Sequence, residues 1–299
     1  MLPPVPATRC ADYGLSRRAL AAAIAAGDVM QVGKGFVVGA DWLTPDETAE
    51  SHAIRVAAAL ERMRGLAAAS HGSAALLQAL SRIGRPNSQV RLTRGGGRYR
   101  RLDCDARLHV AGLPPEHVTT AHGVVVTTPA RTVIDLARVV SFRSGVVIAD
   151  SAMAQGTTRE ELTAVLDYCR RWPGRRTAVR VADFASPLAE TPIESVSRVL
   201  FHEYGLPQPV LQHALVGVSG ADYRVDFYWE EFGVVGEADG LLKYDDPMAG
   251  RREKVRELDI EDLGLEVVRW TWEQLWRTPD LVAAKVRRAL DQGRRRRTA

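Results

Sequence analysis

The chain has 299 residues, enough for two or three domains, and its 46% hydrophobic and 25% charged residues are ordinary for a globular protein. No apolar run approaches the roughly 18 residues of a spanning helix. The start shows no secretory signal, so we expect a cytoplasmic protein without membrane spans. Three widely spaced cysteines (Cys10, Cys104 and Cys169) argue against a disulfide scaffold or a zinc ribbon.

Charge is divided unevenly along the chain. Residues 1–185 carry 24 Lys and Arg against 16 Asp and Glu, whereas residues 186–299 carry 16 against 20. A basic first part is typical of proteins that meet an anionic partner, and DNA is the obvious candidate. Arginine abundance by itself is weak support, because only four of the 40 basic residues are lysines, as a GC-rich genome would produce.

Residues 8–39 predict a short helix followed by a hairpin. Ser16 is an N-cap candidate, Gly27 ends the helix, and residues 29–38 form two short strands around a glycine-containing turn. This outline resembles the winged helix-turn-helix of AbiEi-type antitoxins, which are transcriptional autorepressors, although the usual first helix is missing or very short. The resemblance implies that Arg17 and Arg18 meet DNA. The alternative is a degenerate docking module.

The middle region, residues 43–185, alternates helix and strand signals. We expect helices over 44–64, 73–83, 128–137, 144–155 and 159–171, and strands over 89–93, 106–110 and 124–127. Two arginine-rich clusters lie in this region, one with Arg98 and Arg100 around Tyr99 and one around Trp172. Arginines beside an aromatic residue can hold phosphate and stack on bases, but both clusters could equally be solvated loops.

A third region begins with a helix opened by Thr191-Pro192-Ile193-Glu194. Two strands follow, over 224–229 and 234–240. A hairpin loop centred between Glu231 and Phe232 places Asp226 directly opposite Glu237, and side-chain alternation puts Asp239 on the same face. Three carboxylates on one face repel one another unless a cation binds between them, and hard oxygen ligands of this kind favour Mg²⁺ or Mn²⁺. The alternative is that these acids form the solvent-exposed face of the hairpin.

Other residues near these acids also have two interpretations. Thr191 and Glu194 fit a capping box, which alone could explain both. Lys243 could activate a water molecule or be an ordinary surface lysine. Arg252 and Arg256 share a face of a predicted helix and could hold phosphate, or they could pair with acids of their own helix.

The series from Glu194 through Arg224-Val225-Asp226-Phe227, Glu237-Ala238-Asp239-Gly240, Arg252-Glu253-Lys254 and Val267-Val268-Arg269-Trp270 resembles a domain of actinobacterial proteins. That domain is related to very-short-patch-repair endonucleases of the PD-(D/E)xK superfamily, and the resemblance covers about residues 186–278. It implies that Asp226 and Glu237 are the metal-binding acids and that Glu194 is the helix acid.

One departure from the family bears on catalysis. Asp239 stands where the superfamily has its lysine, and Lys243 would substitute for it from a shifted position. Residues 123–137 also look like AbiEi antitoxin-like multidomain proteins, which implies a cognate toxin or defence partner.

These observations predict a mixed α/β (α+β) fold. It comprises a winged-helix-like unit (1–42), an antitoxin-like α/β middle domain (43–185), a restriction-endonuclease-like mixed sheet flanked by helices (186–293) and a frayed basic tail (294–299). Trp270 and Trp272 should share the core face of a strand over 266–272, and Thr278-Pro279-Asp280 should open the last helix.

Three functions remain open from the sequence. The first is a Mg²⁺-dependent DNA endonuclease domain fused to an antitoxin-like half. The second is a non-catalytic DNA-binding regulator of the antitoxin kind. The third is a nuclease fold used only for protein contacts.

Overall fold

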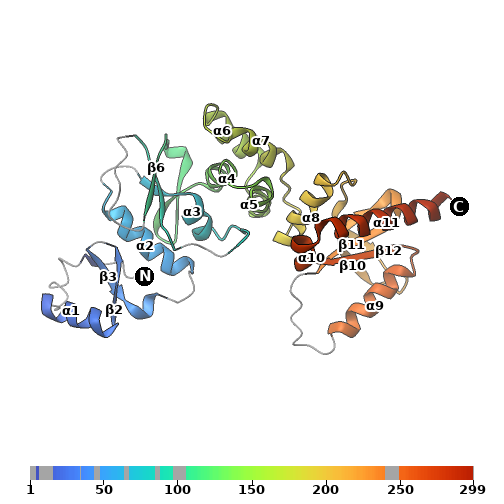
Figure 1. Ribbon diagram of the computed structural model, residues 1–299, viewed down its shortest axis with the longest axis horizontal. Coiled ribbons are helices and arrows are strands. Elements are labelled where there is room, and N and C mark those ends of the chain that lie inside the picture. Colours follow the sequence, from blue (N-terminus) through green and yellow to red (C-terminus); the bar gives the residue numbers. More distant parts are fainter. Residues whose placement is uncertain are drawn as a thin grey trace. The chain divides into compact units, whose positions relative to one another are not determined.

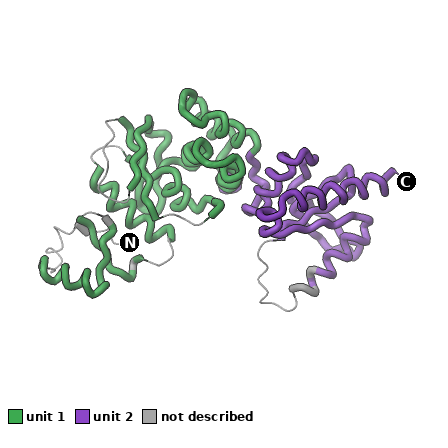
Figure 2. Tube along the Cα trace, viewed as in Figure 1, with its two compact units in different colours: residues 1–152, 156–184 green, residues 153–155, 185–299 purple. Residues whose placement is uncertain are grey.

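The computed structural model describes residues 5–6, 16–33, 35–43, 48–63, 67–84, 88–96, 106–239 and 249–298. Its contacts divide the chain into two compact units, Met1–Ala152 with Gly156–Phe184 and Met153–Gln155 with Ala185–Ala299 (Figure 2). Both units combine helices with sheets, so the predicted α+β class is confirmed. None of the helices in these ranges is long and apolar enough to cross a membrane.

The first elements of unit 1 are a helix and a small sheet. They are β1 (Val5–Pro6), α1 (Arg17–Ala26), β2 (Val29–Gly33), β3 (Phe36–Gly39) and the 3-10 turn η2 (Ala40–Trp42). The Ser16 hydroxyl caps α1 by accepting the Ala19 N–H at 3.2 Å, and Gly27 ends it with φ +83°. The predicted helix and hairpin are therefore present, in a sheet of order β1-β3-β2.

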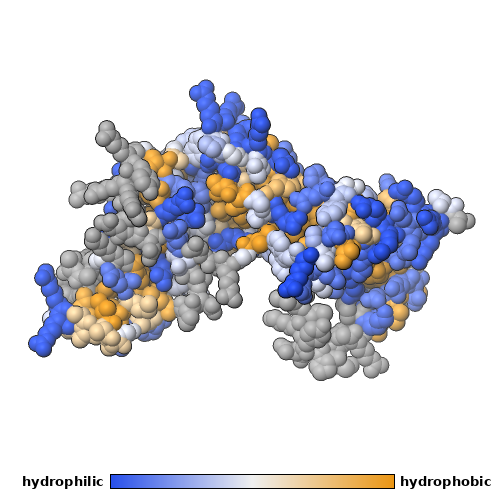
Figure 3. All heavy atoms as spheres, viewed as in Figure 1, coloured by the Kyte–Doolittle hydropathy of each residue, from blue (hydrophilic) through white to orange (hydrophobic). Residues whose placement is uncertain are grey.

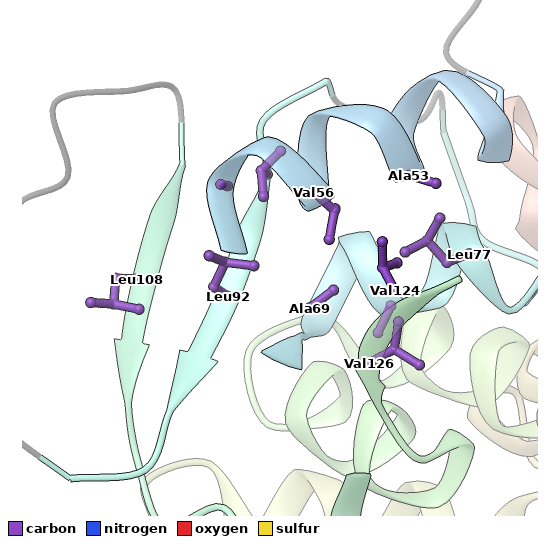
Figure 4. Packing of buried hydrophobic residues seen from close by; sticks show 11 residues of the cluster. Ala53, Val56, Ala69, Leu77, Leu92, Leu108, Val124 and Val126 are labelled. Atoms are coloured by element: carbon purple, nitrogen blue, oxygen red, sulfur yellow. The ribbon is translucent and has the colours of Figure 1, made fainter. Parts of the chain in front are cut away.

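A second sheet of unit 1 has the order β6-β5-β4-β8-β7. Figure 1 labels its edge strand β6. Its elements are α2 (Ala49–Glu61), β4 (Ala67–Ala69), α3 (His71–Leu77), β5 (Arg91–Arg94), β6 (Arg107–Val110), η3 (Pro115–His117), β7 (Val118–Ala121) and β8 (Val124–Thr127). Figure 4 shows Ala53 and Val56 of α2 packed with Leu77 of α3 and with Leu92 and Val126 of the sheet. The helix expected over 73–83 ends at Leu77, because Ala79 takes a positive φ of 53°.

Four helices complete unit 1: α4 (Pro129–Ala137), α5 (Phe142–Ala154), α6 (Arg159–Tyr168) and α7 (Arg175–Phe184). Local caps fix two of their starts, since Thr128 accepts the Arg131 N–H and Thr158 forms a capping box with Glu161. The second arginine cluster is in part helical, because Arg175 begins α7. The apolar face of α7 packs against α4 and α6.

Unit 2 contains a four-stranded sheet of order β12-β11-β10-β9, in which β11 and β12 are parallel and the other pairs antiparallel. Its elements are α8 (Pro192–Glu203), β9 (Val210–Val216), β10 (Asp222–Trp229), η4 (Glu230–Phe232), β11 (Val234–Asp239), α9 (Ala249–Glu261), β12 (Glu266–Thr271), α10 (Trp272–Arg277) and α11 (Pro279–Thr298). Ile260 of α9 packs on Val225 and Val235, and Phe201 of α8 packs on Phe227 and Trp270. Helices therefore cover both faces of this sheet.

Two expectations about the end of the chain are wrong. The strand β12 stops at Thr271, and Trp272 instead opens α10, because Thr271 and Gln274 form a capping box. The basic tail is not frayed either, since α11 continues to Thr298. The Arg294 guanidinium lies 5.0 Å from the centre of the Phe232 ring, and Arg296 pairs with Glu266 at 2.9 Å.

A candidate acidic site on the C-terminal sheet

The hairpin of β10 and β11 has the register predicted from its loop. Trp229 pairs with Val234, Tyr228 with Val235 and Phe227 with Gly236, so Asp226 and Glu237 come next on the two strands. The ladder stops at that point. Instead, Asp226 Oδ2 accepts the Ala238 N–H at 2.8 Å, which gives this backbone donor a partner where the strands separate. The two acids therefore lie at the open end of the hairpin.

Glu237 is buried and paired with a cation from α9. Its Oε1 lies 2.8 Å from Arg256 Nη2, and the same nitrogen donates to the Arg224 carbonyl at 2.9 Å. The pKa of Glu237 is raised to about 7, mainly by burial and in smaller part by the charge of Asp226, against the opposing effect of Arg256. The predicted phosphate contact Arg256 is thus, in this structure, the counter-charge of an acid.

Asp226 shares this electrostatic environment. Burial raises the pKa of its carboxyl, and the negative charge of Asp239 acts in the same direction. The Ala238 N–H and the guanidinium of Arg256 oppose that shift. The raised pKa of both acids therefore reflects mainly the cost of burying their charges, with a smaller contribution from neighbouring carboxylates.

Glu194 lies in the first turn of α8 and is held by hydrogen bonds at both carboxylate oxygens. Thr191 Oγ1 accepts the Glu194 N–H at 3.4 Å and donates to Glu194 Oε1 at 2.5 Å. The other carboxylate oxygen accepts the Glu190 N–H at 2.9 Å and the Gln212 side-chain amide at 2.8 Å. Burial raises the pKa of Glu194, and the Asp226 charge contributes in the same direction. Thr191 therefore caps α8 as expected, but the Glu194 carboxylate accepts the N–H of Glu190 and not that of Thr191, so the reciprocal half of the capping box is shifted by one residue.

Gln212 is a site residue that the sequence did not indicate. It has a φ of +51°, which is uncommon for a residue with a side chain, and it interrupts the β9–β10 ladder opposite Asp226. Its side-chain amide connects the sheet to Glu194. No local motif marks this position, because positive φ is usually signalled by Gly or Asn.

Asp239 belongs to a second group of ion pairs at the end of β11. Its Oδ1 lies 3.8 Å from Arg269 Nη1, and Arg269 Nε lies 3.2 Å from Glu257 Oε2. The parallel β11–β12 ladder also places Arg269 beside Glu237. Within the described ranges, no group of three or more His, Cys, Asp or Glu side chains is placed to hold a metal ion.

The donor chemistry nevertheless fits a hard divalent cation. Asp226 and Glu237 offer carboxylate oxygens on neighbouring strands. At Glu237, the guanidinium of Arg256 supplies the positive charge that a bound metal ion would otherwise supply. These two acids are therefore the pair that could bind Mg²⁺ or Mn²⁺ if Arg256 were displaced from Glu237.

The remaining predicted contacts are distributed elsewhere. Lys243, Arg98 and Arg100 lie outside the described residues. Arg252 is exposed on α9. Arg17 and Arg18 are exposed in the first turn of α1, and Figure 3 shows hydrophilic side chains gathered at one end of that helix.

Comparison with known proteins places one part of the chain. Residues 56–183 match the family described as the AbiEi antitoxin C-terminal domain. This part of the chain resembles an antitoxin domain. It covers the second sheet of unit 1 and the helices α4 to α7, in agreement with the expected antitoxin-like middle region.

Two uncharacterised proteins of Mycobacterium tuberculosis, from the strains CDC 1551 / Oshkosh and ATCC 25618 / H37Rv, are also similar. Each is 29% identical over 173 residues, which is 58% of this chain. The match spans 64% of the length of these relatives.

Proposed function

We propose that unit 2 is a metal-dependent DNA endonuclease domain, fused to a DNA-binding half of the antitoxin type. The observation that carries this proposal is the Asp226–Glu237 pair, two largely buried carboxylates brought together at the open end of the β10–β11 hairpin. A bound Mg²⁺ or Mn²⁺ would polarise the phosphate and supply a nucleophilic water.

The protein groups have separate tasks in this proposal. Asp226 and Glu237 hold the cation, and Asp239 assists from the end of β11. Glu194, fixed by Thr191 and Gln212, keeps negative charge next to Asp226. Arg256 would move from Glu237 to a DNA phosphate when the cation binds, with Arg252 beside it on α9. Lys243 would orient the attacking water.

The test is nicking of supercoiled plasmid with Mg²⁺ or Mn²⁺. Asp226→Asn should abolish cleavage while the protein stays folded, because an amide is a far weaker cation ligand. Asp222→Asn is the matched control, since Asp222 is an exposed acid on the same strand, and it should cut like the unmodified protein. Equal nicking by Asp226→Asn would refute the site.

A second candidate is a non-catalytic DNA-binding regulator with a cognate toxin. Two observations favour it: the match of residues 56–183 to an antitoxin domain, and the ion pair by which Arg256 already neutralises Glu237. Exposed Arg17 and Arg18 add to it, because two arginines at a helix N-terminus oppose the helix dipole and so do not serve helix stability. Both candidates act on DNA and therefore predict a cytoplasmic location.

Binding without metal separates the two candidates. A regulator predicts a sequence-selective gel shift with its own promoter in the presence of EDTA, reduced in an Arg17→Gln/Arg18→Gln double variant. A shift that is equal on unrelated DNA and disappears with salt would count against a regulator.

A further inference from the structure

Unit 1 contains a cavity that neither the acidic site nor the antitoxin match explains. It has a volume of about 590 Å³, which is within the range of small-molecule sites. Its walls come from α3, β5, β6, α4 and the segment between α6 and α7. All of these elements belong to one compact unit.

Cationic side chains dominate the polar wall. Arg107 and Arg138 line the cavity, and the charges of Arg91 and Arg131 also reach its histidines. Asp135 is the acid in the described lining, and it is already paired with Arg131 at 2.9 Å and Arg138 at 3.5 Å. The wall therefore carries more positive than negative charge, which favours an anionic ligand.

Two stacked histidines add neutral hydrogen-bonding groups. The rings of His71 and His109 lie 3.9 Å apart, and both line the cavity. Burial lowers the pKa of His71 to about 3 and that of His109 to about 4, with the nearby arginines acting in the same direction. Both imidazoles are thus neutral at pH 7 and offer N–H donors without adding charge.

Two buried nitrogen atoms in this region have no hydrogen-bond partner within the protein. They are His109 Nε2 and Arg131 Nη2. Buried polar atoms normally have hydrogen-bond partners, and a bound ligand would provide partners for these two nitrogen atoms. Arg131 is otherwise fully held by Asp135, His117 and the Gly112 carbonyl, so its direction is fixed.

Apolar side chains also line the cavity. Leu108, Val110 and Val139 are among them, and Trp172 contributes an aromatic ring whose centre lies 4.7 and 4.8 Å from the guanidinium groups of Arg131 and Arg138. An inorganic anion alone would not contact these apolar side chains. A ligand that combines a phosphate with an organic ring matches both kinds of lining.

We propose that this cavity binds a small phosphomonoester of nucleotide size, with its phosphate near Arg107, Arg138 and His109. Arg107 is the exposed member of this set and lies on β6, so it is the residue to change with least effect on the fold.

The test is isothermal titration of the full chain with three probes: inorganic phosphate, a nucleoside 5′-monophosphate, and the same nucleoside without phosphate. We expect the monophosphate to bind best, phosphate to bind more weakly and the nucleoside not to bind. Arg107→Gln and His109→Asn should each weaken monophosphate binding about tenfold or more, as loss of a charged or buried hydrogen bond does. Arg170→Gln, an exposed arginine outside the cavity, should bind like the unmodified protein.

Three results would overturn the proposal. One is no binding of the monophosphate by the unmodified protein, and another is equal weakening by Arg170→Gln. The third is binding of a short DNA duplex that depends on Arg107 when the monophosphate does not bind, because it would make this surface a nucleic-acid contact. Nuclease activity plays no part in these measurements, so this proposal and the proposed function can fail separately.

Discussion

Arg256 of α9 and Glu237 of β11 form an ion pair at 2.8 Å, with only 21% and 10% of their side chains exposed. The same guanidinium bonds the Arg224 carbonyl of β10, so one side chain joins a helix to both strands of the hairpin. The pair therefore links the stability of unit 2 to the charge state of its candidate site.

Removal of this cation should destabilise the protein in a pH-dependent way. Arg256→Gln leaves the charged carboxylate of Glu237 without its partner, which costs up to about 1.4 kcal/mol at pH 8, because the carboxyl, with a pKa of about 7, takes up a proton when the cost would be larger. At pH 8 this cost applies, whereas at pH 5.5 Glu237 is protonated, because its pKa is about 7, and the loss should be much smaller. Urea unfolding followed by tryptophan fluorescence measures both values.

Arg252→Gln is the control for that experiment, since Arg252 lies one turn earlier on α9 and is exposed. Its effect on unfolding should be within about 0.5 kcal/mol at either pH. An equal loss for Arg256→Gln at pH 5.5 and pH 8 would show that the side chain acts by packing and not by charge.

The Glu237 carboxyl should itself make stability fall as pH rises. Its folded pKa of about 7 exceeds its ordinary value of 4.5, so between these values the folded state holds a proton that the unfolded state has lost. Stability therefore decreases from pH 4.5 to 7, by about 2–4 kcal/mol from this group. Glu237→Gln should flatten that part of the thermal-stability profile. The exposed Glu231→Gln should leave its slope unchanged, and the same slope in Glu237→Gln would contradict the assignment.

Local signals explain which elements could be predicted. Ser16, Thr128 and Thr191 each cap a helix that the sequence located, because a cap acts on its own backbone within three residues. The strand β4 was missed, since Ala67–Ala69 has no strand propensity and is held by its neighbours β5 and β8. The helix α10 had a signal, the Thr271–Gln274 capping box, which the alternating tryptophans obscured.

The same contrast holds for the candidate site. The loop position fixed the register that brings Asp226 next to Glu237, because hairpin pairing is set locally. The roles of Gln212 and Arg256 depend on contacts between elements distant in sequence, with Gln212 18 residues from Glu194 and Arg256 19 residues from Glu237. No pattern in the sequence reports such packing.

His71 should make unit 1 sensitive to acid. Its folded pKa of about 3 is below its ordinary value of 6.5, so the unfolded state binds the proton first and stability falls as pH drops from 6.5 towards 3. His71→Asn should reduce that slope in thermal unfolding between pH 7 and 4.5, and asparagine tolerates the positive φ of 52° at this position.

His122→Asn is the matched control, because His122 also has a positive φ, of 49°, but is exposed. Its acid profile should follow that of the unmodified protein. An unchanged profile in His71→Asn would mean that other groups govern acid stability.

Gly293 should be required for the last turns of α11 to dock. A Cβ at this position would lie 2.0 Å from the Phe232 carbonyl oxygen, so the backbone must shift. Gly293→Ala should destabilise by about 1–3 kcal/mol in spite of alanine's helix propensity. Arg295→Ala, exposed on the same helix, is the control and should be near neutral. A gain in melting temperature for Gly293→Ala would contradict this packing.

The most direct test of the central claim is nicking of supercoiled plasmid by the unmodified protein, Glu237→Gln and Glu231→Gln, each with Mg²⁺, Mn²⁺ or EDTA. The account predicts metal-dependent nicking by the unmodified protein and by Glu231→Gln, and its loss in Glu237→Gln. Metal-dependent nicking that persists at the same rate in Glu237→Gln would contradict a nuclease centred on the Asp226–Glu237 pair.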